Sequence, residues 1–275
     1  MTNYFGKGSQ PLLERNKLTS FDAIWALGTE WFETPNIRRG GWSGVIKYPL
    51  KGLNGDNSYI FIKRQENHRS KTWRHPIKGI PTFQREYNNL RYFEQKSIPC
   101  PALVYYGSRH YNGNDQAILI TQDLATYTSV DNILPDDKLG LIKNQQHRHQ
   151  LLRRTAEVIR LMHEHHIQHD SLYPKHIFAT PVNDGWDVRL IDLEKAKHRL
   201  FKKRLVIKEL ATFRRHTYDW TEQEQSIFFK AYVDETELSE KSKKLWKQAA
   251  HRKKSNLGLF YLVPCTETFC NYMFY

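Results

Sequence analysis

The spacing of apolar residues changes near the middle of the chain. In the first part they come in short runs, at 59–63, 102–108 and 116–121. Turn residues separate these runs, at 51–57 and 112–114. Short apolar runs between such turns are typical of β-strands. From His147 to His166 the apolar residues instead recur with the period of a helix. The pattern predicts an α+β fold with a small β-rich half followed by a mainly helical half.

Two helices are predicted in the first half, one over Ser20–Glu33 and one that opens at Pro81-Thr82, with Thr82 as its N-cap. The second helix has an apolar stripe made of Phe83, Tyr87, Leu90 and Phe93. Glu86 lies at the edge of that stripe, where an unpaired carboxylate is costly. Lys63 ends the strand 59–63, which is apolar on both faces, and is the natural partner for Glu86. Alternatively, Lys63 lies in solvent at a sheet edge and Glu86 is an ordinary surface residue.

In the second half a hairpin is predicted to turn at residues 183–185, and its second strand, Val188–Ile191, leads directly to Asp192. The remainder is predicted to be mainly helical and is very basic. The boundary between the halves is placed at Gln122-Asp123. This gives an N-lobe over 1–122, with the glycine turn, Lys63 and the Glu86 helix, and a helical C-lobe over 123–275.

Composition narrows the class of protein. With 275 residues, 39% of them hydrophobic and 13% aromatic, the chain can bury a sizeable core. The apolar run Leu257–Val263 is too short to span a bilayer, and residues 1–16 lack the apolar segment of a signal peptide. Three cysteines with no metal-ligand spacing fit a reducing compartment. These features predict a cytoplasmic protein. A net charge of +13 predicts an anionic partner.

Several segments carry the parts that phosphoryl transfer requires. These parts are a glycine-rich turn, a lysine fixed by a glutamate, a loop with a base and a metal ligand, and a metal-binding carboxylate. The corresponding residues occur in this order: Gly41, Ser43 and Gly44, then Lys63, Glu86, His169, Asp170, Ser171, His176 and Asp192. Each signal alone is ambiguous, since the glycine turn could be a plain hairpin turn. A zinc site at His165, His166 and His169 is disfavoured because no matching cysteine or carboxylate cluster is present. The fixed order makes the set more specific than its members.

The chain resembles the lipopolysaccharide kinase family of Kdo/WaaP type, and most closely its InaA-like branch. The resemblance runs from about Arg38 to Tyr232 and rests on residues 39–45, 168–178, 190–195, 214–215, 220 and 228–232. It implies a two-lobed protein-kinase-like fold, ATP and magnesium as cofactors, and a sugar hydroxyl of the lipopolysaccharide core as acceptor. It also implies that Lys63, paired with Glu86, grips the ATP phosphates. By the same resemblance Asp192 holds magnesium, and His176 stands where many kinases keep a metal-binding Asn.

The chain departs from the kinase pattern at several positions. Ser171 stands in the place of the catalytic Asp, and Asp170 lies one residue too early. A missing general base costs roughly 10²–10⁴ in rate, although phosphoryl transfer depends mainly on positioning and charge. Phe61 shares a face with Lys63 where kinases keep a small residue above the adenine. The chain is therefore either an atypical kinase or a pseudokinase that acts as a regulatory or interaction module. A nucleic-acid binder would explain the charge but not the ordered residues.

Two basic stretches flank the predicted site. The first contains Arg64, Arg69, Lys71, Arg74 and Lys78, and the second contains Lys195, Lys197, Arg199, Lys202, Lys203, Arg204 and Lys208. We expect them to steer an anionic glycolipid or lipopolysaccharide core acceptor, although they could also be a solvated surface. Lysines at 241–247 and the apolar tail after them either dock on the inner-membrane surface or pack on the C-lobe. The whole interpretation requires Lys63, Glu86 and Asp192 to converge on one crevice.

Overall fold

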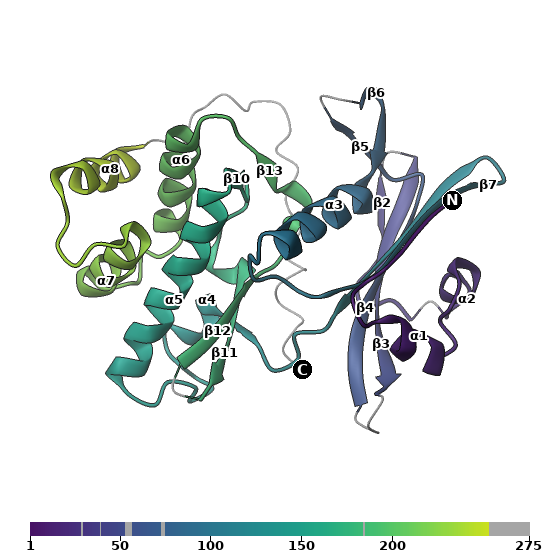
Figure 1. Ribbon diagram of the computed structural model, residues 1–275, viewed down its shortest axis with the longest axis horizontal. Helices are drawn as coiled ribbons and strands as arrows, with labels where there is room; N and C mark the ends of the chain where they lie inside the picture. The colour runs from purple at the N-terminus through teal and green to yellow at the C-terminus, as the bar shows by residue number, and fades with distance from the viewer. Residues whose placement is uncertain (29, 39, 53–56, 73–74, 184, 253–275) are drawn as a thin grey trace. The chain divides into compact units, whose positions relative to one another are not determined.

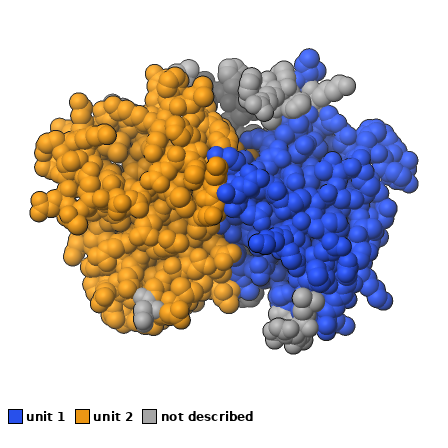
Figure 2. Space-filling model, in the orientation of Figure 1, with its two compact units in different colours: residues 1–95, 100–125 blue, residues 96–99, 126–275 orange. Residues whose placement is uncertain are grey.

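The computed structural model describes residues 1–28, 30–38, 40–52, 57–72, 75–183 and 185–252 (Figure 1). The chain divides into two compact units (Figure 2). Unit 1 contains residues 1–95 and 100–125, and unit 2 contains residues 96–99 and 126–275. Mixed α and β structure, with a sheet in unit 1 and helices dominating the described part of unit 2, confirms the predicted fold class.

Unit 1 is built on a six-stranded antiparallel sheet with the strand order β1-β7-β8-β4-β3-β2. Its strands are β1 (Thr2–Phe5), β2 (Asn36–Arg38), β3 (Gly41–Lys51), β4 (Asn57–Glu66), β7 (Leu103–Tyr111) and β8 (Asn114–Gln122). A separate hairpin pairs β5 (Arg69–Thr72) with β6 (His75–Pro81). The predicted turn at 112–114 is confirmed, since Tyr111 pairs with Asn114 across it.

Strand β4 has two different faces. Ile60 and Ile62 belong to the core that packs against α1 (Gln10–Arg15) and α2 (Phe21–Trp25). Phe61 and Lys63 alternate with them and therefore point to the opposite face. The prediction for this strand was wrong in two respects. The strand continues to Glu66 instead of ending at Lys63, and Tyr59 is 42% exposed rather than buried.

The helix predicted over Ser20–Glu33 is much shorter in the structure, where α2 ends at Trp25. Arg64 explains the early end, because its Nη1 atom donates to the carbonyls of Trp25 at 2.6 Å and Leu27 at 3.0 Å. A longer helix would need the Trp25 carbonyl for its own hydrogen bonds. The chain instead turns toward β3, and the Phe32 amide donates to the Val45 carbonyl at 2.8 Å.

Helix α3 (Thr82–Gln95) covers the sheet face opposite α1 and α2, as Figure 1 shows. The helix begins at Thr82, so Thr82 is its first helical residue and not the N-cap that the sequence predicted. Phe83, Leu90 and Phe93 are buried as their spacing predicted. Tyr87 stacks on Tyr106 of β7, with the ring centroids 4.1 Å apart. This packing fixes the height and rotation at which the helix presents Glu86.

Unit 2 is dominated by helices. They are α4 (Val130–Ile133), α5 (Gln145–Glu164), α6 (Lys202–Arg215), α7 (Glu222–Val233) and α8 (Glu240–His251). Its short strands are β9 (Thr128–Ser129), β10 (Ile167–Gln168), β11 (Ile177–Val182), β12 (Gly185–Leu190) and β13 (Lys197–His198), with 3-10 turns η1 (Pro174–His176) and η2 (Leu193–Lys195). The predicted long helix is confirmed as α5, and the predicted hairpin as β11 and β12, with Val182 paired to Gly185.

Some predictions fall outside the part of the chain that the structure describes. The apolar run Leu257–Val263 and the aromatic tail are among them, so their docking stays a prediction. Within the described ranges, every helix is too short or too polar to cross a bilayer.

Candidate active site

Lys63 and Glu86 form an ion pair inside unit 1. Lys63 projects from β4 and Glu86 from α3, and their Nζ and Oε1 atoms are 2.6 Å apart. Both side chains are largely buried, with 15% of Lys63 and 8% of Glu86 exposed. The predicted pairing is confirmed, and it satisfies a carboxylate that would otherwise be buried without a counter-charge. The grip on ATP phosphates that the resemblance implied stays a prediction.

The predicted glycine turn belongs to the hairpin of β2 and β3, in which Arg38 pairs with Gly41. Both glycines of β3 allow a close approach that a side chain would block. A Cβ on Gly41 would lie 2.2 Å from the Glu66 carbonyl oxygen, and one on Gly44 would lie 2.4 Å from the Trp31 ring. Ser43, between them, pairs with Gln65 of β4. These glycines thus have a packing role, and their part in covering phosphates remains untested.

Phe61 makes an aromatic surface on the same face as Lys63. Its ring meets the ring of Phe32 edge-on, with centroids 5.4 Å apart. The ammonium of Lys47 lies 5.6 Å from the Phe61 ring centre and forms an ion pair with Asp123 at 3.0 Å. The bulky ring that the sequence analysis singled out is therefore backed by a second ring and a cation.

His169 is fully buried, and its Nε2 atom donates to the Ile191 carbonyl at 2.9 Å. This bond ties the loop that follows β10 to the end of β12, one residue before Asp192. Because no part of its side chain reaches the surface, His169 has no direct access to a substrate. The sequence analysis placed it among the catalytic residues, and the geometry instead supports a positioning role.

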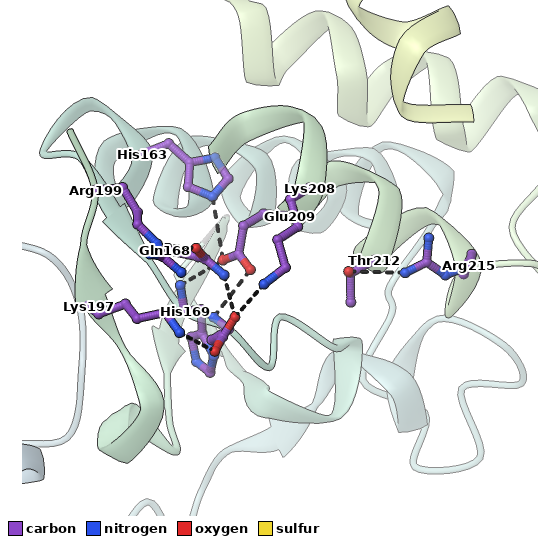
Figure 3. A network of polar contacts seen from close by, with 10 residues as sticks. His163, Gln168, His169, Lys197, Arg199, Lys208, Glu209, Thr212 and Arg215 are labelled. Carbon is purple, nitrogen blue, oxygen red and sulfur yellow. Dashed lines mark hydrogen bonds and ion pairs between the residues drawn. The ribbon is translucent and has the colours of Figure 1, made fainter. Parts of the chain in front are cut away.

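Asp170 is the centre of a charged network, which we call the Asp170 cluster and which comprises Asp170, Gln168, Lys197 and Lys208 (Figure 3). Lys197 donates to Oδ2 at 2.5 Å, Lys208 donates to Oδ1 at 2.7 Å, and the Gln168 amide also donates to Oδ1. Burial would raise the pKa of Asp170, but the two lysines outweigh it and lower the pKa. A carboxylate held this way has little tendency to accept a proton.

Ser171 and His176 are joined through the backbone. Ser171 is 5% exposed, and its carbonyl accepts a hydrogen bond from His176 Nδ1 at 2.8 Å. With the proton on Nδ1, the Nε2 atom of the neutral ring carries the lone pair. Burial is the main reason why the pKa of His176 falls to about 4, so the ring is neutral near pH 7.

Asp192 follows β12 in a left-handed conformation, with φ 57° and ψ 55°. Its carboxylate is 28% exposed, and Oδ2 lies 3.8 Å from His176 Nδ1. Asp192 and His176 together offer one carboxylate and one imidazole. The described residues contain no group of three or more His, Cys, Asp or Glu that could hold a metal ion. The Asp192 carboxylate suits a divalent cation that takes its other ligands from phosphate oxygens and water, as Mg²⁺ does at nucleotide sites. The His176 imidazole is a ligand of the kind that zinc, copper or iron prefers.

Glu209 is a functional candidate that the sequence analysis missed. It projects from α6, is 1% exposed, and accepts the backbone amides of His169 at 2.7 Å and Asp170 at 3.2 Å. Figure 3 shows it beside His163, whose Nε2 lies 3.8 Å away. The signal was present, because Glu209 interrupts an apolar stripe of α6 just as Glu86 does in α3. Glu209 positions the loop through its backbone.

The predicted basic stretches prove to be heterogeneous. In the first stretch, Arg64 is buried at 2% exposure and Arg69 pairs with Asp115, so these two residues offer less free charge than expected. The side chains of Lys71, Arg74 and Lys78 lie outside the part of the chain that the structure describes. In the second stretch Lys197 and Lys208 serve the Asp170 cluster. Several members remain exposed: Lys195, Arg199, Lys202, Lys203 and Arg204. They accompany two exposed apolar residues, Leu200 at 89% and Phe201 at 69%.

Comparison with known proteins places the chain among relatives of kinases. Residues 22–232 match the model of the lipopolysaccharide kinase (Kdo/WaaP) family. Protein InaA of Escherichia coli (strain K12) is 27% identical over 190 residues, which cover 69% of this chain and 84% of InaA. The solved structure of WaaP in complex with acyl carrier protein superposes with a TM-score of 0.61 at 18% identity, covering 90% of this chain and 92% of that one. The likeness in structure supports the fold, and the matched family model covers most of the chain, so this protein belongs to the lipopolysaccharide kinase (Kdo/WaaP) family.

Proposed function

We propose that the protein transfers a phosphoryl group from ATP to a hydroxyl of an anionic sugar acceptor of the lipopolysaccharide core type. The Lys63–Glu86 ion pair carries this proposal, since a lysine fixed by a helical glutamate is the arrangement that kinases use to hold nucleotide phosphates. Membership of the family supports ATP as the donor. The acceptor is carried over from the family.

Each unit would contribute its own ligands, unit 1 to the nucleotide phosphates and unit 2 to a divalent cation. Lys63 would contact the phosphates, and the hairpin of β2 and β3 that carries Gly41, Ser43 and Gly44 would cover them. Asp192 would hold a divalent cation, with His176 Nε2 as a second donor. A bound cation supplies charge that offsets the negative charge of the phosphates.

The loop after β10 supports an atypical mechanism. Its carboxylate, Asp170, is occupied by two lysines and an amide, and Ser171 is nearly buried. We assign Asp170 and His169 to positioning the loop. Ser171 stands at the position where kinases have the general base. Loss of a base lowers the rate by about 10²–10⁴, and the remaining catalysis comes from positioning and charge.

The segment from Arg199 to Arg204 is the part of unit 2 that best suits an anionic acceptor. It exposes Lys202, Lys203 and Arg204 beside Leu200 and Phe201. Cations next to exposed apolar side chains fit a phosphorylated glycolipid, whose headgroup is anionic and whose chains are apolar. The proposal therefore includes peripheral attachment to the inner-membrane surface through this segment.

A second function, that of a pseudokinase acting as a regulatory or interaction module, is favoured by the same loop. The Asp170 carboxylate forms ion pairs with two lysines, and Ser171 stands in place of the base. Both features are expected of a protein that has lost catalysis. The two functions share nucleotide binding and differ only in phosphate transfer.

The decisive experiment measures thermal unfolding with and without Mg-ATP. A nucleotide at 100 times its Kd stabilises the folded state by about 2.7 kcal/mol, which raises Tm by roughly 5–10 °C. Lys63→Ala and Asp192→Ala should abolish the increase, while Lys51→Ala at the end of β3 should retain it. If Mg-ATP leaves Tm of the wild-type protein unchanged, the kinase proposal is wrong. Transfer of labelled phosphate to a lipopolysaccharide extract then separates kinase from pseudokinase.

The acceptor segment is tested by charge reversal. Lys202→Glu, Lys203→Glu and Arg204→Glu together should reduce co-sedimentation with anionic glycolipid vesicles about tenfold or more, because three phosphate contacts are lost. The same charge change at Lys7, Lys17 and Lys51, three exposed lysines of unit 1, is the control. Equal losses for both triple variants would mean that only net charge matters.

A further inference from the structure

Residues 31–33 belong to the connection between α2 and β2, and the Trp31 and Phe32 rings lie on opposite faces of the sheet in unit 1. The Phe32 amide bonds to the Val45 carbonyl at 2.8 Å and ties this segment to β3. Val45 pairs with Lys63 on the neighbouring strand. The segment therefore lies at the level of the lysine that the proposed function places on the nucleotide phosphates.

Trp31 anchors the segment on the face of α1 and α2. Its ring lies against Gly44, where a Cβ would come within 2.4 Å of it, and the Arg64 guanidinium lies 5.0 Å from the ring centre. The Trp42 ring packs against it with centroids 5.5 Å apart. These contacts hold one end of the segment firmly and explain why position 44 is a glycine.

Phe32 lies on the opposite side, against Phe61, and the next residue is Glu33, whose charge interacts with that of Lys63. The Phe32 ring meets the Phe61 ring at 5.4 Å, edge to face. Glu33 is half-buried, and burial raises the pKa of its carboxyl while the charge of Lys63 lowers it. Consecutive residues thus bring an aromatic ring to Phe61 and a carboxylate into the field of Lys63.

A nucleotide would bring the same two chemical groups to the same two residues. Its base is a flat ring that would pack at Phe61, and its phosphates are anions that would meet Lys63. We propose that Phe32 and Glu33 cover this face and must be displaced before ATP binds. This inference rests on the proposed function, because it assumes that Lys63 is a nucleotide ligand. Residues 31–33 thus compete with ATP for this face of the sheet.

The expected size of the effect follows from the share of molecules in which the segment is displaced. The apparent Kd equals the intrinsic Kd divided by the fraction of competent molecules. If about one molecule in ten has the face open, removal of the competitor tightens binding about tenfold.

The experiment is a titration with a fluorescent ATP analogue and Mg²⁺. Phe32→Ala and Glu33→Gln should each tighten binding, and the double variant should do so by about tenfold. Glu33→Gln keeps the size of the side chain and removes only its charge, so it tests the idea even if Phe32→Ala folds poorly. Glu30→Gln and Ile37→Ala, both at exposed positions of the same region, are the matched controls and should not change the Kd.

Two results would overturn the inference in different ways. Unchanged affinity in the Phe32 and Glu33 variants, with binding still lost in Lys63→Ala, would leave the proposed function standing and remove the competitor. Failure of the wild-type protein and every variant to bind the analogue would remove both.

Discussion

The Lys63–Glu86 pair in unit 1 and the Asp170 cluster in unit 2 use the same chemical groups in opposite proportions. In the first, one buried carboxylate neutralises one ammonium. In the second, one carboxylate accepts from two ammonium groups and an amide. The pair therefore has no net charge, whereas the cluster has an excess of one positive charge. An ion pair without net charge suits a lysine that has to bind phosphate. A cluster with net positive charge opposes protonation of its carboxylate, which a general base requires.

The two units therefore differ in which groups of the kinase pattern they contain. Unit 1 keeps the Lys63–Glu86 ion pair, and the Phe32 and Phe61 rings pack together on the face of the sheet that carries Lys63. In unit 2, His169 and Glu209 hold the loop after β10, in which Ser171 stands at the position that kinases give to the base.

The largest expected effect comes from restoring the base. Ser171→Asp places a carboxylate where kinases have one, and it should raise phosphate transfer by roughly 10²–10⁴. The readout is the rate of labelled phosphate transfer to the lipopolysaccharide extract at saturating Mg-ATP. Ser171→Ala serves as control and should give no gain. An unchanged rate in a folded, nucleotide-binding Ser171→Asp protein would show that the loop does not limit the reaction.

A smaller effect is expected from neutralising the centre of the cluster. Asp170→Asn leaves Lys197 and Lys208 facing each other without an anion, so the free energy of unfolding should fall by about 1.5–3 kcal/mol. Urea unfolding measures it. Asp136→Asn, which removes an exposed partner of Lys138, is the control and should cost less than about 0.5 kcal/mol. A large loss of transfer rate without loss of stability would identify Asp170 as a base after all.

The smallest effect is a pH dependence confined to acid. The folded-state pKa of Asp170 lies below its ordinary value of 3.8, so its stabilising contribution is fully present above that value. As the pH falls through the lowered pKa, Asp170 is protonated and the contribution is lost. The difference in unfolding free energy between the wild type and Asp170→Asn should be constant from about pH 5 to 7 and shrink below about pH 4. A difference that instead shrinks between pH 5 and 7 would contradict this assignment.

Much of the candidate site could be predicted because its residues stand out in local patterns of the sequence. Glu86 on an apolar stripe required a counter-charge, and Lys63 was the cation available on a buried strand. The positive net charge, by contrast, led to a wrong prediction for the location of an individual residue. Arg64 was placed on a basic surface, yet it is buried and ends α2 by taking the carbonyls of Trp25 and Leu27. No local pattern reports such a contact, because its partners are nearly forty residues apart.

Local sequence patterns were enough to predict the fold class, several turns and the order of the chemical groups, since periodicity and turn residues act over a few neighbouring positions. Which charged groups pair with one another depends on contacts between segments that are far apart in the sequence. These contacts bring Asp170 two lysines from β13 and α6, join Glu209 to the backbone of the loop, and tie Phe32 to Val45 of β3. These contacts join distant segments, and burial sets their strength, so packing rather than residue type fixes the charge that each group presents.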